Sequence, residues 1–303
     1  MRINLPVRRF GLIAVAGVLF VPPASAQQVV DLTYDTRVAA PAYPKGGPRV
    51  LIDEAHRNFH TAGGRYKPFA DLITADGFQV TAGTAPFSAA TLAAGQIVVI
   101  SNARGEPPDT PAFTDAECDA VRDWVRAGGS LLLIADHAPM GSAAAALAQR
   151  FGVQMSATST LDDKNYFVDR GNRGFIVYTR ESGGIADHPI TSGRNAGERL
   201  QKVMTFTGQS LKGPEGSVAL LRLADSARDR VAGSETETTS AAGRAQAIAL
   251  TFGRGRVVVL GEAGMLSAQT VGPDRLPMGM NQPGIDNRQF ALNVMHWLSG
   301  LLK

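Results

Sequence analysis

The sequence has very little cysteine, because Cys118 is the only one in 303 residues. A single cysteine cannot form a disulfide within the chain, so the fold must depend on its hydrophobic core. Histidine is also scarce, with five in the whole chain. The sequence lacks a long hydrophobic run as well, since the apolar stretch 10–21 is too short for an ordinary membrane-spanning helix.

That short apolar stretch has the features of a secretory signal peptide. Arg2, Arg8 and Arg9 precede it, and an Ala-Ser-Ala cleavage site follows it at residues 24–26. We therefore predict that residues 1–26 are a signal peptide and that the mature protein begins at Gln27. The expected location is the periplasm or the medium.

The mature chain is expected to have no excess of charge. The whole sequence has 30 Lys and Arg against 27 Asp and Glu, and removal of the three signal-peptide arginines (30 − 3 = 27) leaves the two equal. This balance argues against nucleic acid and anionic lipid as partners. We expect no stable membrane insertion after cleavage, and the sequence does not indicate a protein partner.

Short apolar runs alternate with helix-like segments from residue 49 onward, which is typical of βαβ units. The runs show no alternation of apolar and polar residues, so we expect buried strands covered by helices on both faces. The predicted fold is an α/β, flavodoxin-like domain over residues 49–303, with a mainly parallel sheet. An extended segment, 27–48, precedes it, and a β-rich insertion is expected at roughly 153–245. The predicted central strands are RVLIDE, QIVVISN, SLLLIAD and RVVVLGE.

Two helices carry recognisable start signals. Thr114 and Glu117 form a capping box before an apolar face that includes Cys118. Asp286 and Gln289 are expected to cap the C-terminal helix in the same way.

Polar side chains follow four of the predicted strands. Ligands bind outside the carboxyl ends of strands in sheets of this kind. Carboxylates and imidazoles gathered there can act as general acids and bases. The predicted catalytic candidates are Asp53, Glu54, His56, Asp136, His137 and Glu262. Each has a structural alternative: the first three could hold loops open, Asp136 could cap the next helix, and Glu262 could be a favourable acid at a helix N-terminus.

Other polar residues are candidates for ligand binding, because amides and guanidinium groups suit hydroxyl-rich or anionic ligands. The predicted ligand-binding residues are Asn58, His60, Asn102, His188, Asn281, Asn287 and Arg288. The His56 and His60 pair has the i, i+4 spacing found in zinc enzymes, but it runs into a glycine-containing loop. We predict no cofactor, and a divalent metal at this pair stays the alternative.

The chain resembles the class I glutamine amidotransferase-like superfamily over nearly all of its mature length. It is most similar to an exported bacterial branch without a settled activity, and to domains of the gliding-motility transporter-accessory and trehalose-utilisation types. The segments that carry the resemblance are VLIDEAHRNFHTAGGRYKPFADLITADGF, GGSLLLIADHAPMG, DHPITSGR, TFTGQSL, GRGRVVVLGEAGMLSAQ and GMNQPGIDNRQFALNVMHWLSGLL.

One departure from that superfamily concerns its chemistry. Glutamine amidotransferases have a cysteine nucleophile on a tight strand-to-helix turn, whereas this chain has His137 after the corresponding strand. The His-x-Glu pair of that superfamily is not matched either, because His188 is followed by Pro189 and Ile190. Glutamine amidotransferase activity is therefore not expected, and Cys118 is expected to be a buried, inert thiol.

Two hypotheses of function follow. In the first, an exported α/β protein binds a small polar, carbohydrate-like ligand at the carboxyl edge of the sheet and hydrolyses it by acid-base chemistry. In the second, the protein is a non-catalytic ligand-sensing or assembly module of an envelope or transport system. An enzyme requires the acids and histidines to converge on one reacting point, whereas a module requires only a covered sheet.

Overall fold

The computed structural model describes Met1 and residues 28–303, apart from positions 109, 232 and 235. The predicted signal peptide therefore lies outside the described residues except for Met1. Within the described ranges, no helix is long and apolar enough to cross a bilayer.

The centre of the molecule is a sheet of nine strands. Five adjacent strands of this sheet run parallel to one another. Four of these five are the strands expected from the apolar runs. In spatial order the parallel strands are β3 (Gln79–Gly83), β2 (Arg49–Asp53), β4 (Ile97–Ser101), β5 (Ser130–Ile134) and β15 (Gly255–Leu260).

The rest of this sheet is antiparallel, so the sheet is mixed and the expectation of a mainly parallel one needs correction. The chain reverses at Gly253 and Arg254, where Phe252 pairs with Gly255, and the preceding strand therefore runs against β15. Residues 253 and 254 thus form the turn of a β-hairpin. The antiparallel strands are β14 (Ala245–Phe252), β10 (Leu211–Lys212), β6 (Gln154–Met155) and β11 (Val218–Arg222), the last pairing with β14.

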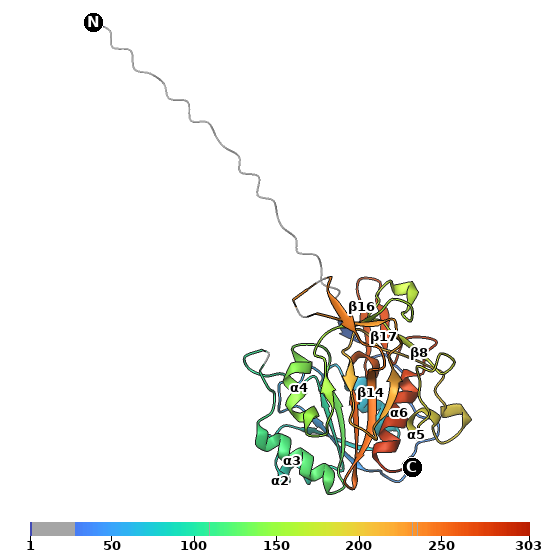
Figure 1. Cartoon of the computed structure of the whole chain (residues 1–303). Helices are drawn as coiled ribbons and strands as arrows, with labels where there is room; N and C mark the ends of the chain where they lie inside the picture. Colours follow the sequence, from blue (N-terminus) through green and yellow to red (C-terminus); the bar gives the residue numbers. More distant parts are fainter. Residues whose placement is uncertain (2–27, 109, 232, 235) are drawn as a thin grey trace.

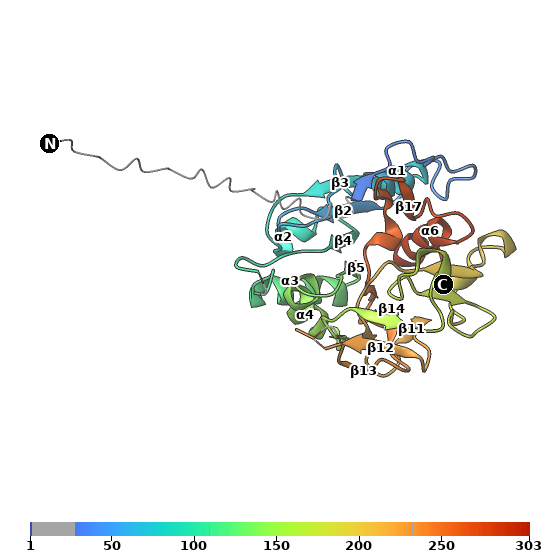
Figure 2. The same cartoon turned by 90° about the horizontal axis from the view of Figure 1, so that it is seen from above.

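Helices cover both faces of the sheet, and Figures 1 and 2 show them on either side of it. One face carries α1 (Lys67–Ala75) and α6 (Asn287–Leu298), and the short α5 (Pro189–Ser192) packs against α6. The other face carries α2 (Ala89–Leu92), α3 (Asp115–Arg126) and α4 (Met140–Gln149). Each face has its own apolar core. Because the central strands are buried on both sides, their sequences are continuously apolar.

The two predicted helix starts turned out differently. Thr114 and Glu117 form the expected capping box, and Cys118 is fully buried on α3. Asp286 precedes α6 but makes no side-chain cap. Its carboxylate instead accepts hydrogen bonds from the backbone N–H groups of Gln201 and Lys202, which ties the start of β9 (Lys202–Met204) to the start of α6.

Three smaller sheets surround the main one. The first lies above the main sheet at the top of Figure 1 and consists of β1 (Gln28–Val30), β16 (Ala268–Val271) and β17 (Leu276–Gly279). The second consists of β13 (Thr238–Ser240), β12 (Ala227–Arg230) and β7 (Thr160–Asp162), and the third of β8 (Val177–Thr179) and β9 (Lys202–Met204). Short 3-10 turns are η1 (Val168–Arg170), η2 (Ala196–Glu198) and η3 (Gly264–Leu266).

Segment 153–245 contributes strands to several of these sheets. It supplies β6, β10 and β11 to the main sheet, and it supplies all the strands of the second and third small sheets. The segment therefore forms part of the main sheet through strand pairing, in addition to packing beside it. The N-terminal segment contributes β1, which pairs with β16.

Candidate functional site

The carboxyl ends of β2, β4, β5 and β15 lie side by side, but their polar side chains divide between the two faces of the sheet. Ile52 and Leu260 belong to the core under α1 and α6, and successive strand residues point to opposite faces. Asp53, one residue after Ile52, therefore points toward α2 and α3, whereas Glu262, two residues after Leu260, points toward α1 and α6. The expectation that both groups face one crevice was wrong.

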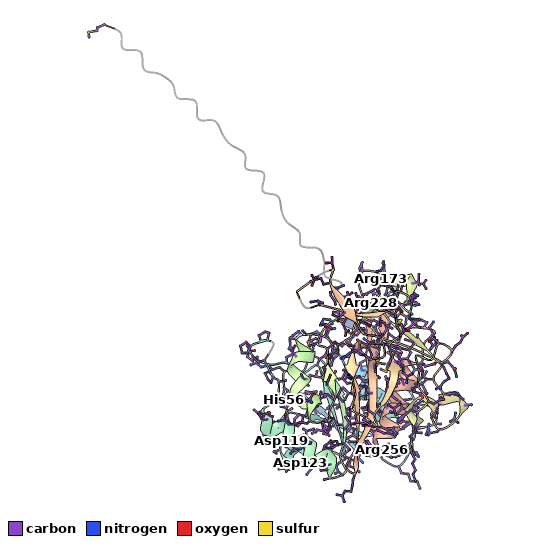
Figure 3. The ribbon with its side chains drawn as sticks, viewed as in Figure 1. His56, Asp119, Asp123, Arg173, Arg228 and Arg256 are labelled. Carbon is purple, nitrogen blue, oxygen red and sulfur yellow. The ribbon has the colours of Figure 1, made fainter. Side chains whose placement is uncertain are left out.

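His56 is held between two carboxylates on the α3 face. Its Nδ1 lies 2.9 Å from both carboxylate oxygens of Asp53, and its Nε2 lies 2.9 Å from Oε1 of Glu117. Asp53 is fully buried and His56 is 7% exposed. Figure 3 shows His56 on the side of the sheet that carries α3. The arrangement links the loop after β2 to the first turn of α3.

The surroundings favour the charged form of this histidine. Burial lowers the pKa of His56, but its hydrogen bonds to Asp53 and Glu117 raise it by more, so the pKa lies above its usual value of 6.5. The pKa of Glu117 lies at about 2, because hydrogen bonds from His56 and Thr114 outweigh the effect of burial. The ring of His56 also packs 4.7 Å from those of Phe87 and Phe113, centroid to centroid. An imidazolium with both nitrogens engaged has no nitrogen left to act as a base.

Two further predicted residues hold the same loop. Asn58 accepts a hydrogen bond from the backbone N–H of His56 and donates one to Asp53 at 3.0 Å. Glu54 accepts a hydrogen bond from the backbone N–H of Ala62 at 2.8 Å. These contacts match the alternative in which the polar residues after β2 hold the loop in place.

His60 does not converge with His56. Its ring packs 4.6 Å from that of Tyr66, which belongs to the core under α1. Burial lowers the pKa of His60 to about 3, so this ring is neutral. Its Nδ1 is buried without a hydrogen-bond partner in the described part of the chain. The i, i+4 spacing therefore does not produce a pair of ligands.

Asp136 and Glu262 form the second polar group, on the α1 and α6 face. Asp136 accepts hydrogen bonds from the backbone N–H of Ala263 at 2.7 Å and from Nδ2 of Asn102 at 2.7 Å. Glu262 accepts from the backbone N–H groups of Gly264 and Met265, at 2.5 and 2.8 Å. Glu262 thus takes the helix-terminal role at η3, whereas Asp136 does not cap α4, which has no side-chain cap.

The pKa values of both acids are raised. Burial raises the pKa of Glu262 to about 8, the negative charge of Asp136 adds to this, and the backbone N–H donors oppose it. Burial also raises the pKa of Asp136, against hydrogen bonds from Asn102 and Ala263. Two interacting carboxyls with raised pKa values can share a proton. Glu262 is almost completely buried, with 2% of its surface exposed.

His137 follows Asp136 and lines a cavity of about 330 Å³ at the carboxyl end of β5. Its Nδ1 lies 2.9 Å from the carbonyl oxygen of Ala138. Nδ1 must donate this hydrogen bond, which leaves Nε2 as the acceptor when the ring is neutral. The lining includes His137, Ala138, Ala157, Thr158, Ser159 and Arg230.

The side chain of Gln209 holds together two segments that border this cavity. Gln209 donates from Nε2 to the carbonyl oxygens of Ala135 and Asp136, and its Oε1 accepts from the backbone N–H of Ala157. One amide side chain therefore fixes the end of β5 against the loop before β7. Gln209 lies in the quoted segment TFTGQSL but was not recognised as a site residue, because its hydrogen bonds reach groups that are distant in the chain. Ser159 was missed because no motif includes it.

Four predicted ligand-binding residues lie elsewhere and have structural roles. His188 accepts from the backbone N–H of Ile190 at the start of α5. Asn281 donates to Asp31 and to the carbonyl oxygen of Gln269. Asn287 is buried and bonds both backbone groups of Met204. Arg288 donates to the carbonyl oxygen of Arg37.

A second cavity of about 330 Å³ lies in segment 153–245 and contains none of the predicted residues. Its lining includes Asp162, Tyr178, Ser182 and Arg222. Over the described residues, no three His, Cys, Asp or Glu side chains are grouped so that they could hold a metal ion.

Residues 60–274, well over half of the chain, match the family described as Domain of unknown function (DUF4350). The chain belongs to this family. Comparison with curated proteins finds no match for this DUF4350 chain.

Solved structures are similar to this DUF4350 chain at low sequence identity. A structure described as the mmIFT52 N-terminal domain has a TM-score of 0.59 and 14% identity, covering 83% of this chain and 97% of that one. A putative ThuA-like protein from Bacteroides uniformis has a TM-score of 0.45 and 13% identity, with coverage of 86% and 93%. At these identities only the first likeness supports a statement, and that statement concerns the fold alone.

Proposed function

We propose that this DUF4350 protein is a non-catalytic module that binds a small polar, carbohydrate-like ligand in the cavity beside His137. The observation that carries the proposal is a contrast at one edge of the sheet. The acids expected to be catalytic are occupied by hydrogen bonds from the protein itself, whereas the cavity next to them presents hydroxyl and imidazole groups.

The first part of this contrast argues against catalysis. Asp53 accepts from His56 and Asn58, and Glu262 accepts from two backbone N–H groups. A general acid or base must reach the proton that it transfers. These carboxylates would have to break internal hydrogen bonds first.

The second part supports a polar ligand. Within the described residues, Ser159 Oγ and His137 Nε2 have no hydrogen-bond partner, and both residues are half-buried. The cavity thus offers a hydroxyl that can donate or accept and an imidazole acceptor. Hydroxyl groups of a sugar match this set of donors and acceptors.

Hydrolysis of the ligand is the second candidate function. It is favoured by the raised pKa of Glu262, about 8, which suits a general acid near neutral pH. Formation of product from a bound ligand would distinguish this candidate from binding alone.

The superfamily of the chain and its location outside the cytoplasm are part of the same proposal. We place the DUF4350 chain in the flavodoxin-like, amidotransferase-like superfamily, in an exported branch that lacks the cysteine nucleophile, on the basis of the sequence segments quoted above. Export to the periplasm or the medium rests on the signal-peptide pattern. N-terminal sequencing of the mature protein tests it, and a start at Gln27 is expected.

Isothermal titration calorimetry with a panel of mono- and disaccharides, trehalose included, tests the binding proposal. Ser159→Ala is expected to weaken binding about fivefold, the usual effect of losing one neutral hydrogen bond. The matched control is Ser182→Ala, which changes a serine in the other cavity and should leave affinity unchanged. Binding should persist in the presence of a chelator. The proposal fails if no saccharide binds, or if the two variants behave alike.

A further inference from the structure

The loop that follows β2 presents a partly buried positive charge without an acidic partner. Arg65 donates from one terminal nitrogen to the amide oxygens of Gln28 and Gln269, at 3.1 and 2.7 Å. No carboxylate of the described residues lies within ion-pair distance of it. Burial lowers the pKa of Arg65. A desolvated charge costs free energy unless a counter-ion is supplied.

A second arginine contacts the same aromatic ring. The guanidinium carbon of Arg65 lies 4.3 Å from the ring centroid of Phe59, and that of Arg104 lies 5.6 Å from it. Arg104 donates from Nε to the carbonyl oxygen of Arg57 at 3.0 Å, and it too has no carboxylate partner among the described residues. Arg57 is different, because it forms an ion pair with Glu106. The ring of Phe59 thus contacts two guanidinium groups that have no carboxylate partner among the described residues.

The ring that both arginines contact is open to solvent. Phe59 is 40% exposed, although it is a large hydrophobic residue. Exposed aromatic side chains beside arginines are characteristic of protein–protein interfaces.

We propose that Phe59, Arg65 and Arg104 form a docking surface for an acidic segment of a partner protein. Carboxylates of that segment pair with the two guanidinium groups, whose planar donor geometry matches a carboxylate. Apolar side chains of the segment contact Phe59. A peptide is favoured over a small anion because the exposed ring would otherwise have no function in binding. The surface is separate from the cavity beside His137 and does not depend on the function proposed for it.

Fluorescence anisotropy with a short labelled peptide of glutamate, aspartate and leucine tests the proposal. Arg65→Gln and Arg104→Gln are each expected to weaken binding about tenfold, which corresponds to the loss of one charge-assisted contact. The matched control is Arg126→Gln, because Arg126 also stacks on a phenylalanine, Phe252, at 5.1 Å. Arg126 already has an acidic partner, Asp123, and its replacement should not change the affinity.

Thermal unfolding separates binding from a structural role. Arg65→Gln removes the hydrogen bonds to Gln28 and Gln269, so a modest fall in melting temperature is expected together with the loss of peptide affinity. A lower melting temperature with unchanged peptide affinity would show that Arg65 only supports the fold, and would overturn the proposal. Equal binding of the corresponding glutamine and asparagine peptide would do the same. Displacement of the peptide by an equal concentration of inorganic phosphate would assign the surface to small anions instead.

Discussion

Replacement of His56 by alanine is expected to destabilise the protein strongly. The substitution removes a buried imidazolium and leaves the carboxylates of Asp53 and Glu117 without their shared partner. Breaking a buried ion pair from one side costs about 3–5 kcal/mol. Because Glu117 keeps some contact with solvent and also bonds Thr114, the lower part of this range is expected. For a domain of this size, the melting temperature should fall by roughly 6–12 °C.

The size of this effect should depend on pH in a defined way. The pKa of His56 is raised in the folded state, so its contribution is fully present below about 6.5 and is lost as the pH rises through the folded pKa. The pKa of Glu117 is lowered to about 2, so its contribution is present above 4.5 and is lost as the pH falls toward 2. The difference between wild type and His56→Ala should therefore be largest between about pH 4.5 and 6.5.

Differential scanning calorimetry of both proteins across this pH range measures the difference. His137→Ala is the control. Among the described residues, the ring of His137 is hydrogen-bonded only to the neighbouring Ala138 carbonyl, so its loss should change the unfolding free energy by less than about 0.5 kcal/mol. An unchanged melting temperature in His56→Ala, together with loss of ligand binding, would refute the structural role of the triplet. A destabilisation that is independent of pH would refute the ionic explanation.

The acids and the thiol give two further predictions. Because the folded pKa of Glu262 is raised from 4.5 to about 8, the unfolding free energy should fall as the pH rises through this interval. In Asp136→Asn, the NMR titration midpoint of the Glu262 carboxyl carbon should move to lower pH. An unchanged midpoint would show that the two carboxyls do not interact. Burial raises the pKa of Cys118 to about 11, so the native thiol should react only slowly with alkylating reagents. Rapid alkylation of the folded protein would contradict this expectation of a buried thiol. Cys118→Ala should cost about 1 kcal/mol of stability without changing ligand affinity.

Much of the main sheet could be predicted because its strands are continuously apolar. The strands β2, β4, β5 and β15 have such runs. The strand β14 was missed: its sequence, AQAIALTF, is rich in alanine and contains the buried polar Gln246. Its antiparallel direction follows from the hairpin at Gly253.

The site was predicted in its composition but not in its arrangement. Polar residues do follow the expected strands, yet whether two of them share a face depends on the register between strands. Register is set by pairings such as Ile52 with Val99 and Ile134 with Leu260, which no single strand encodes. The partner of His56 was missed for a similar reason. Glu117 has an evident local role in a capping box, and its second contact spans 61 residues.

The most direct test of the proposed function is to map the binding position by NMR. A saccharide that binds should be titrated into isotopically labelled protein, and the amide shifts should be followed residue by residue. The largest changes are expected at His137, Thr158 and Ser159, with those at Asp53 and His56 staying small. Large changes centred on Asp53 and His56, or on Glu262, would show that the ligand reaches the occupied carboxylates and would contradict the account.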